Sequence, residues 1–335
     1  MRQKLLLQMV MAVLLAGVAA AQTGTALSGP TMGLVFDASH SALRPIRGIP
    51  GAATLGDAVN PGFPLASATV SPRQDFALAL RADDSSVVLV RAGGAFAAVP
   101  GARPAPALMV FSPAGATAAL YDSGAGRVQV LTGLPDAAAV QSDVDISALA
   151  GPVAALAVDD AGTSLFLAAG AADTVALYRV GMDGASQYMA SFGSVAALRL
   201  SANGREALVA DSAAAAVYAI RDLAGAGAVE TLASGRDGLV TPIAIESDSA
   251  GRVFVADQAG NVTILDRGQG SILSLPCGCA PTGLFRLSGT ATFRLTEPSG
   301  APIWVLDASG TDARIVAVPP SAAPVASAAD SGGGQ

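Results

Sequence analysis

A polar-then-apolar pattern recurs along this chain at nearly even intervals, and this repetition limits the possible folds more than any other feature. Each copy opens on a polar residue, continues into an apolar run that often ends in Ala-Asp, and passes through a small-residue turn into a second apolar run. Six copies are recognisable, and they begin at Ser71, Ser112, Asp159, Ser201, Ser247 and Ser288. Their mean spacing is about 43 residues, a period typical of propeller blades and other stacked repeats.

The apolar runs within each copy have the length and punctuation of β-strands. Examples are SLFLAAG (residues 164–170) and TVALYRV (residues 174–180), which a short turn separates. Beyond the N-terminal segment no run shows the sustained periodicity of an amphipathic helix, so helical repeat arrays are disfavoured. Each copy therefore predicts a blade of four short antiparallel strands in an all-β propeller.

The number of blades follows from the room that the repeats leave. Six four-stranded units fit between Phe63 and Pro320, and residues 32–46 supply one further hairpin ahead of them. We predict seven blades, the first incomplete and closed by the N-terminal hairpin, because closing the ring removes exposed sheet edges. Six blades with an extra hairpin are the alternative. In both cases residues 32–320 form a single domain.

The repeat resembles a known blade type. The pattern S-x-x-G, an apolar run ending in Ala-Asp, a turn and a second run beginning with Val is similar to the blades of YVTN and NHL repeat proteins, which are WD40-like. The resemblance is clearest at Ser201–Ile220 and Ser247–Leu265, although the tyrosine of the YVTN signature is mostly missing. It implies a β-propeller fold and says little about the ligand.

The N-terminal segment has the composition of a signal peptide. Arg2 and Lys4 precede an apolar stretch, Leu5–Val18, and three alanines follow at residues 19–21. We expect cleavage before Gln22, with an uncleaved N-terminal anchor as the alternative. The mature protein is then exported to the periplasm or the extracellular space and is soluble.

Two further segments stand outside the repeats. Residues 22–31 form a linker between the signal peptide and the propeller. Residues 321–335 lack apolar periodicity, and we expect this tail to be disordered.

The charge of the mature chain excludes several classes of function. Removing Arg2 and Lys4 from the 19 basic residues leaves 17 arginines and no lysine against 26 acidic residues. Such a balance disfavours nucleic acid and anionic membranes as partners. A P-loop and Schiff-base chemistry both need lysine, and His40 alone cannot form a zinc site built on several histidines. We expect His40 to lie in an exposed turn.

Cys277 and Cys279 flank a glycine where one blade passes into the next. Cysteines of exported proteins normally pair, but two cysteines separated by one residue reach each other only if the chain bends sharply. Gly278 permits such a bend. A disulfide is the favoured reading, while a pair of free or intermolecular thiols, a redox pair and a soft-metal site remain open.

An acidic residue follows the second apolar run in most copies. These residues are Asp83, Asp122, Asp211, Asp257 and Glu297. Equivalent positions of a propeller recur on one face, so the five carboxylates could form an acidic ring for a cation or a basic partner. The simpler interpretation is that each carboxylate fixes its own turn by accepting backbone hydrogen bonds. Five arginines do not share one blade position and are interpreted as dispersed surface charges: Arg81, Arg199, Arg221, Arg252 and Arg294.

Two classes of function remain after these exclusions. The first is a monomeric, non-catalytic binding or protein-interaction scaffold without a cofactor, for an unknown protein or small-molecule ligand. The second is a lactonase-like or other hydrolase that works at the central channel with a divalent cation such as calcium. A channel lined by Ala, Val and Ser would favour the scaffold, and carboxylates gathered from several blades would favour the enzyme. Quinone chemistry is disfavoured because Trp304 is the only tryptophan.

Overall fold

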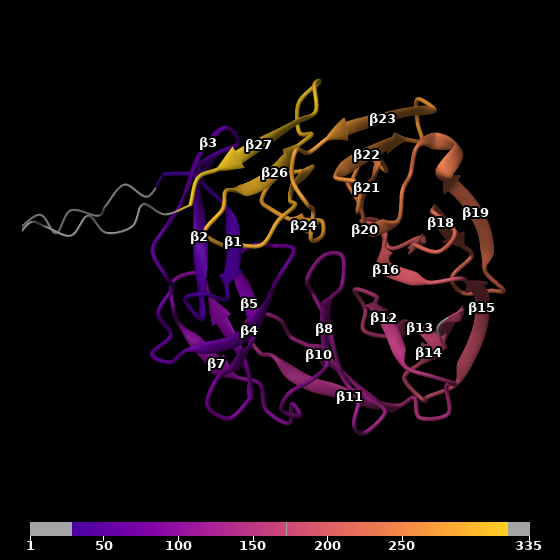
Figure 1. The fold of residues 1–335 in the computed structure, drawn as a ribbon. Coiled ribbons are helices and arrows are strands. Elements are labelled where there is room, and N and C mark those ends of the chain that lie inside the picture. The colour runs from indigo at the N-terminus through magenta and orange to yellow at the C-terminus, as the bar shows by residue number, and fades with distance from the viewer. Residues whose placement is uncertain (1–28, 172, 321–335) are drawn as a thin grey trace, which may run out of the picture.

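The structure, a computed structural model, describes residues 29–171 and 173–320. The predicted signal peptide, most of the predicted linker and the predicted C-terminal tail lie outside the described residues. The described chain forms seven antiparallel sheets that follow one another around a ring (Figure 1). The prediction of an all-β propeller with seven blades, the first of them incomplete, is confirmed.

Each blade is a meander of consecutive strands. Blade 1 has three strands, β1 (Thr31–Asp37), β2 (Ala42–Ile49) and β3 (Ala52–Leu55). Blade 2 consists of β4 (Leu65–Val70), β5 (Phe76–Arg81), β6 (Val87–Arg91) and β7 (Phe96–Ala98). Blade 3 consists of β8 (Leu108–Phe111), β9 (Ala118–Asp122), β10 (Arg127–Thr132) and β11 (Ala139–Asp145). Blade 4 consists of β12 (Val153–Val158), β13 (Ser164–Ala171), β14 (Thr174–Gly181) and β15 (Ser186–Phe192).

The second half of the ring repeats this plan. Blade 5 consists of β16 (Val195–Leu200), β17 (Ala207–Asp211), β18 (Ala216–Arg221) and β19 (Ala228–Ala233). Blade 6 consists of β20 (Pro242–Ser247), β21 (Val253–Asp257), β22 (Asn261–Asp266) and β23 (Ser271–Pro276). Blade 7 consists of β24 (Phe285–Arg286), β25 (Thr292–Arg294), β26 (Ile303–Asp307) and β27 (Arg314–Val318). A single 3₁₀ turn, η1 (Gly235–Asp237), is the only helix among the described residues, which hold no helix long and apolar enough to span a membrane.

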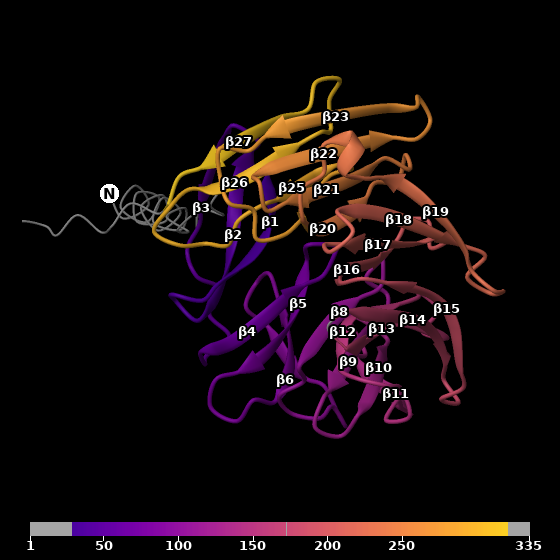
Figure 2. The same cartoon turned by 45° about the vertical axis from the view of Figure 1, so that its right-hand side comes forward.

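The first strand of each blade lies nearest the centre of the ring, and the last strand lies at its rim. Figure 1 shows β8, β12, β16, β20 and β24 around the centre, with β11, β15, β19 and β23 outside them. The rotated view in Figure 2 shows the same order of inner and outer strands. The burial pattern agrees, because the second strands are almost fully buried whereas outer strands such as β19 and β23 are mostly exposed.

The polar start of the repeat is the turn between the first and second strands of a blade. The backbone N–H groups of Ser71, Ser112, Asp159 and Ser201 each donate to a carbonyl oxygen five residues later, over 2.9–3.2 Å. The equivalent donors in blades 6 and 7 are Asp248, which bonds to Arg252, and Leu287, which bonds to Thr292. The sequence alignment on Ser247 and Ser288 was therefore displaced by one residue in each of these two blades.

The hydrophobic core is divided among the junctions between blades. Seven clusters of buried side chains occur among the described residues, and each joins two neighbouring blades. At the junction of blades 6 and 7, Phe254 and Phe293 are fully buried and their ring centroids lie 4.7 Å apart. Alanines on the second strands, such as Ala207 and Ala210, are also fully buried and allow neighbouring sheets to approach closely. The alanine-rich composition thus serves blade packing.

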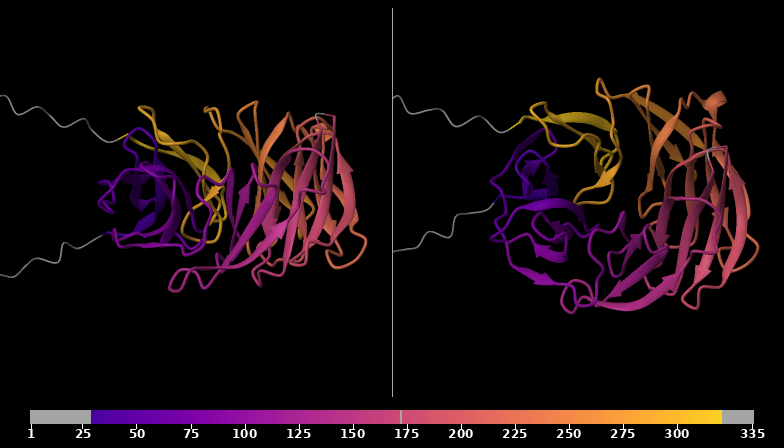
Figure 3. Two further views of the ribbon diagram at one scale, coloured as in Figure 1. Left: turned by 90° about the horizontal axis from the view of Figure 1, so that it is seen from below. Right: turned by 60° about the horizontal axis from the view of Figure 1, so that its bottom comes forward.

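The ring closes between blades 1 and 7 without a strand shared by the two sheets in the described ranges. Figure 3 shows the indigo first blade beside the yellow last blade in both views. Buried side chains including Met32, Val35 and Val318 fill the junction, and the Ser288 N–H donates to the Met32 carbonyl over 2.6 Å. We expected the N-terminal hairpin to close the ring, and it does so as a separate blade that packs on the last one.

A buried glutamine reinforces this closure from the neighbouring blade. The Gln74 side-chain oxygen accepts a hydrogen bond from the Leu34 N–H over 2.8 Å, and its amide nitrogen donates to the carbonyl of Arg286. One side chain of blade 2 thereby connects blades 1 and 7. A Cβ atom at Gly33 would lie 2.3 Å from the Gln74 oxygen, so the close approach requires glycine there.

Blades 5 and 6 are linked by an ion-pair network centred on Glu206. Arg267 Nη1 lies 2.6 Å from Glu206 Oε2, and Arg221 Nε lies 2.9 Å from Glu206 Oε1. The hydrogen bond from Arg267, helped by that from Arg221, lowers the pKa of Glu206 below its usual value although burial acts in the opposite direction. The network therefore favours the folded state when Glu206 is ionised.

Substitution of Glu206 with glutamine is expected to flatten the acid dependence of stability. A carboxyl group whose pKa is lowered by folding contributes stability above its unfolded pKa of about 4.3, and this contribution disappears as the pH falls through the folded pKa. We expect E206Q to lower the free energy of unfolding by about 1 to 3 kcal/mol at neutral pH and to differ little from wild type near pH 3. Urea unfolding across this pH range measures both. Parallel pH curves for the two proteins would contradict the assignment. Glu230 pairs with the same two arginines but its side chain is 45% exposed, so E230Q is the comparison and should change the pH dependence less than E206Q.

Candidate functional site

A cavity of about 280 Å³ lies at the centre of the ring. Residues from all seven blades line it, mostly from the inner strands β1, β4, β8, β12, β16, β20 and β24. Ligand sites of proteins usually occupy cavities of about 300 to 1,000 Å³, and this volume lies just below that range, as suits a small ligand. The central channel is therefore the candidate site.

One layer of the channel is formed by equivalent residues of the inner strands. Each of them occupies the same register position on its inner strand. In blade 1 this position is Phe36 of β1, which pairs with Leu43 of β2, and the other blades repeat the pairing between their first two strands. The channel layer, as we call it, consists of Phe36, Thr69, Val110, Ala157, Arg199, Glu246 and Phe285, and every member lines the cavity. Its members from blades 1 to 4 and from blade 7 carry no charge, whereas those of blades 5 and 6 are ionic.

A second arginine completes the ionic part of the channel layer. Arg199 Nε lies 3.0 Å from Glu246 Oε1, and Arg286 Nη2 lies 3.4 Å from Glu246 Oε2. Arg286 follows Phe285 and also donates to the carbonyl of Ser247. We call Arg199, Glu246 and Arg286 the channel clamp. Glu246 is 15% exposed, whereas the side chains of Arg199 and Arg286 are 42% and 20% exposed.

A further arginine lines the channel beside the clamp. Arg294 is buried, and its Nη1 lies 2.6 Å from Glu297 Oε2 and 2.8 Å from the carbonyl oxygen of Thr296. Its guanidinium carbon lies 4.0 Å from the centroid of the Phe285 ring. Burial lowers the pKa of Arg294, opposed by the nearby carboxylate of Glu297. This cation is thus held by a carboxylate, a carbonyl and an aromatic face.

The arginines of the channel differ from the prediction of dispersed surface charges. Arg199 lines the cavity, and Arg294 lines it and is buried. The channel also differs from one lined by Ala, Val and Ser. The signal for the channel residues is their place two residues before the turn between the first and second strands. Because the alignment began blade 6 at Ser247 and not at Asp248, Glu246 did not align with Arg199.

Two of the five predicted acidic positions are buried and fix loops. Asp211 and Asp257 are the last residues of β17 and β21 and are 2% and 1% exposed. Asp257 accepts a hydrogen bond from the Asn261 N–H over 2.9 Å. Asp211 accepts four backbone hydrogen bonds over 2.8–3.1 Å, from Gly193, Ser194, Ala213 and Ala214. Each carboxylate therefore stabilises the turn that follows its strand.

The other three acidic positions are more exposed and lie beside arginines. Asp83 pairs with Arg81, Asp122 lies 3.7 Å from Arg103, and Glu297 pairs with Arg294. The structure does not gather the five carboxylates: no group of three or more His, Cys, Asp or Glu side chains within residues 29–171 and 173–320 is placed to hold a metal ion. Both carboxylates that line the channel, Glu246 and Glu297, are paired with arginine. This donor set does not fit a divalent cation held by several blades.

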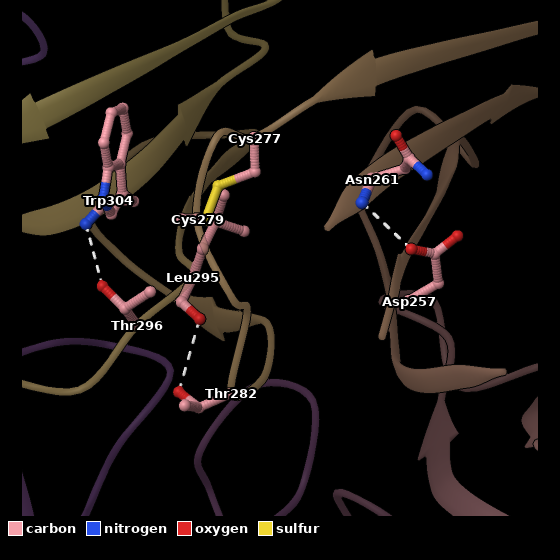
Figure 4. Close-up of a disulfide and its surroundings, with 8 residues drawn as sticks. All are labelled: Asp257, Asn261, Cys277, Cys279, Thr282, Leu295, Thr296 and Trp304. Atoms are coloured by element: carbon pink, nitrogen blue, oxygen red, sulfur yellow. Dashed lines mark hydrogen bonds between the residues drawn. A yellow bond between two sulfur atoms is a disulfide. The ribbon is translucent and has the colours of Figure 1, made fainter. Parts of the chain in front are cut away.

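Cys277 and Cys279 form a disulfide in the loop between β23 and β24 (Figure 4). Gly278 has a φ of 65°, a left-handed conformation that produces the bend, and the two Cα atoms lie 5.0 Å apart. The Cys277 N–H donates to the Gly260 carbonyl over 2.7 Å. Both cysteines pack in the cluster between blades 6 and 7, so the bridge fixes the segment that leads to Phe285 in the channel layer.

His40 lies in the turn after β1, where its side chain is 60% exposed. Its Nδ1 atom is 2.8 Å from Oδ2 of the buried Asp37, which also accepts hydrogen bonds from Ser39 and Arg44. Burial would raise the pKa of Asp37, but the hydrogen bonds from Ser39, Arg44 and His40 outweigh it and lower the pKa. The histidine belongs to a turn of blade 1 and is not among the residues that line the channel.

Comparisons with known proteins identify the fold and no family. No protein-family model and no curated protein sequence matches the chain. Among solved structures, a streptogramin B lyase has a TM-score of 0.57 at 10% identity, over 78% of this chain and 87% of that one. A protein of Bacteroides uniformis proposed to be a 6-phosphogluconolactonase has a TM-score of 0.54 at 15% identity, over 86% and 96%. A chain of a nidogen/laminin complex has a TM-score of 0.51 at 15% identity, over 73% and 93%.

These similarities concern architecture alone, because all identities are far below the level that carries function. The same fold serves a lyase and a complex between two proteins, so the fold does not decide between catalysis and binding. The specific YVTN or NHL blade type stays a prediction.

Proposed function

We propose that this protein is an exported binding propeller that takes up a small organic ligand in its central channel without transforming it. The observation that carries the proposal is the channel layer, in which a largely apolar wall faces a few polar groups. Such a combination is typical of ligand sites, where apolar contacts give affinity and a few polar groups fix the orientation. No calcium ion or other cofactor takes part.

The state of the channel carboxylates favours binding over hydrolysis. A general base or a metal ligand needs a carboxylate that is free to meet a substrate or a cation. Glu246 and Glu297 are each already paired with arginine, so neither is free to meet a substrate or a cation. The lactonase-like alternative would have to break one of these pairs first.

Export and a monomeric state belong to the same proposal. A disulfide is stable in an oxidising compartment, so the Cys277–Cys279 bridge supports a periplasmic or extracellular location. The signal-peptide composition of residues 1–21 points the same way.

A blocked channel tests the proposed function. A library of small organic molecules would be screened by thermal shift against the wild type and against Ala157→Phe, which places a ring in the channel layer. We expect ligands that stabilise the wild type and lose this effect in the variant, because a ligand at 100 times its Kd adds about 2.7 kcal/mol to stability. Val110→Trp is a second blocking variant should the first not fold. Calcium-dependent hydrolysis of lactones by the wild type, lost in Glu246→Gln, would establish the hydrolase instead.

A further inference from the structure

The channel carries a charge opposite to that of the whole molecule. Three arginines and two glutamates line it, which leaves one excess positive charge. The complete chain has a formal net charge of −7. An anion is therefore disfavoured over most of the surface and favoured in the channel, where low-dielectric walls strengthen the local field.

Several hydrogen-bond donors of the channel clamp have no acceptor among the described residues. Arg199 uses Nε for Glu246 and Nη1 for the carbonyl of Leu198, and no described residue accepts from its Nη2. Arg286 uses Nη2 for Glu246 and Ser247, and no described residue accepts from its Nε or Nη1. The two guanidinium groups thus share the single carboxylate of Glu246, although their donors suffice for a second carboxylate. Guanidinium groups prefer planar anions such as carboxylates, which accept two N–H bonds at once.

Blades 1, 3 and 4 supply apolar side chains to the channel. Phe36, Met109, Val110 and Leu156 line the cavity from blades 1, 3 and 4 and bring no charge. A ligand that fits both kinds of residue has an anionic head at the clamp and a hydrocarbon body against these side chains. The cavity of about 280 Å³ has room for about nine groups of the size of a water molecule.

We infer that the channel binds a small amphipathic monocarboxylate, with its carboxylate between Arg199 and Arg286 and its hydrocarbon chain against Phe36, Met109, Val110 and Leu156. This inference rests on the proposed function and specifies its ligand class. The single carboxylate neutralises the excess charge of the channel. A chain of about eight carbon atoms fills the available volume.

Isothermal titration calorimetry with three probes of equal length tests the head group. Octanoate, 1-octanol and octylammonium share the hydrocarbon chain and differ in charge. We expect octanoate to bind at least tenfold more tightly than octanol, and octylammonium not to bind, because hydrogen bonds to charged groups are the stronger ones. Hexanoate is expected to bind about fifteenfold more weakly than octanoate, since each buried methylene contributes about fourfold. Equal affinity for octanoate and octanol would overturn the inference.

Substitutions in the clamp distinguish ligand binding from a purely structural role. We expect R199Q and R286Q to weaken octanoate binding at least tenfold and to leave octanol binding unchanged. E246Q is expected to strengthen octanoate binding about tenfold, because it removes the carboxylate that competes for both arginines. A clamp that only joins blades predicts no gain in E246Q. The control is R221Q, an arginine of blade 5 outside the channel that should bind octanoate as the wild type does.

The outcomes also separate this inference from the proposed function. If the library screen finds channel ligands that Ala157→Phe excludes, but octanoate does not bind or is insensitive to R199Q and R286Q, the monocarboxylate inference fails and the binding function stands. If no compound occupies the channel of the wild type, both fail. Circular dichroism and a thermal melt of each variant establish that it is folded before titration.

Discussion

Replacing Phe293 with alanine is expected to lower the free energy of unfolding by about 3 to 5 kcal/mol. The side chain is fully buried at the junction of blades 6 and 7, where it packs against Phe254 with 4.7 Å between ring centroids. The backbone of the closed propeller can move only slightly into the space that the phenyl group leaves, so a cavity remains. The cost of this cavity adds to the loss of transfer free energy. Equilibrium unfolding in guanidinium chloride measures the difference.

The same substitution at an exposed site is the matched control. Phe96 on the outer strand β7 is 50% exposed, and F96A is expected to cost no more than about 1 kcal/mol. Because the Arg286 guanidinium lies 5.3 Å from the centroid of the Phe293 ring, F293A should also loosen the channel clamp. Similar losses in F293A and F96A would show that the junction clusters do not hold the ring together.

Replacing Asp211 with alanine is expected to cost at least about 2 kcal/mol of folding free energy. The change leaves four backbone N–H groups without their acceptor, in a place where the carboxylate is only 2% exposed. These donors belong to the loop that enters blade 5 and to the turn that follows β17, so both segments lose their common fixed point. Thermal and urea unfolding of D211A measure the effect.

A substitution at Asp83 distinguishes carboxylates that stabilise turns from carboxylates that form an acidic ring for a cation. The Asp83 side chain is 53% exposed and pairs with Arg81, so D83A is expected to leave the free energy of unfolding nearly unchanged. If the acidic positions served together as a cation site, calcium would stabilise the wild type, and D211A and D83A would both abolish this gain. A calcium-dependent stabilisation lost in both variants would contradict the structural role of Asp211.

The architecture was predictable because it depends on a period and on local strand patterns. The turn hydrogen bond that begins at Ser71, Ser112, Asp159 and Ser201 is formed within a few residues, so the sequence around each start carries its own signal. The turn at Asp248 is one residue shorter than those four, and this shortening is not visible without the strand register. Blade 1 was correctly predicted as incomplete.

The channel was not predictable to the same degree, because its contacts join residues far apart in the chain. Arg199 meets Glu246 across 47 residues, and Arg286 meets the same carboxylate across 40. Neither spacing is a motif, since the pairs form only when blades 5, 6 and 7 stand side by side. The sequence also left several fates open for Cys277 and Cys279, because the bend at Gly278 decides whether their sulfur atoms can meet.

The junction between blades 1 and 7, which we call the seam, is the place where the propeller is joined by neither a loop nor a shared strand among the described residues. Within the described residues no backbone ladder crosses the seam, so side-chain packing, the Ser288–Met32 bond and the bridge through Gln74 carry the load there. Tension applied between Thr31 and Val318 would act directly on that gap. We therefore expect blades 1 and 7 to separate first under force, and the remaining blades to unfold one after another. The closed arrangement of the blades would be lost before any single blade unfolds.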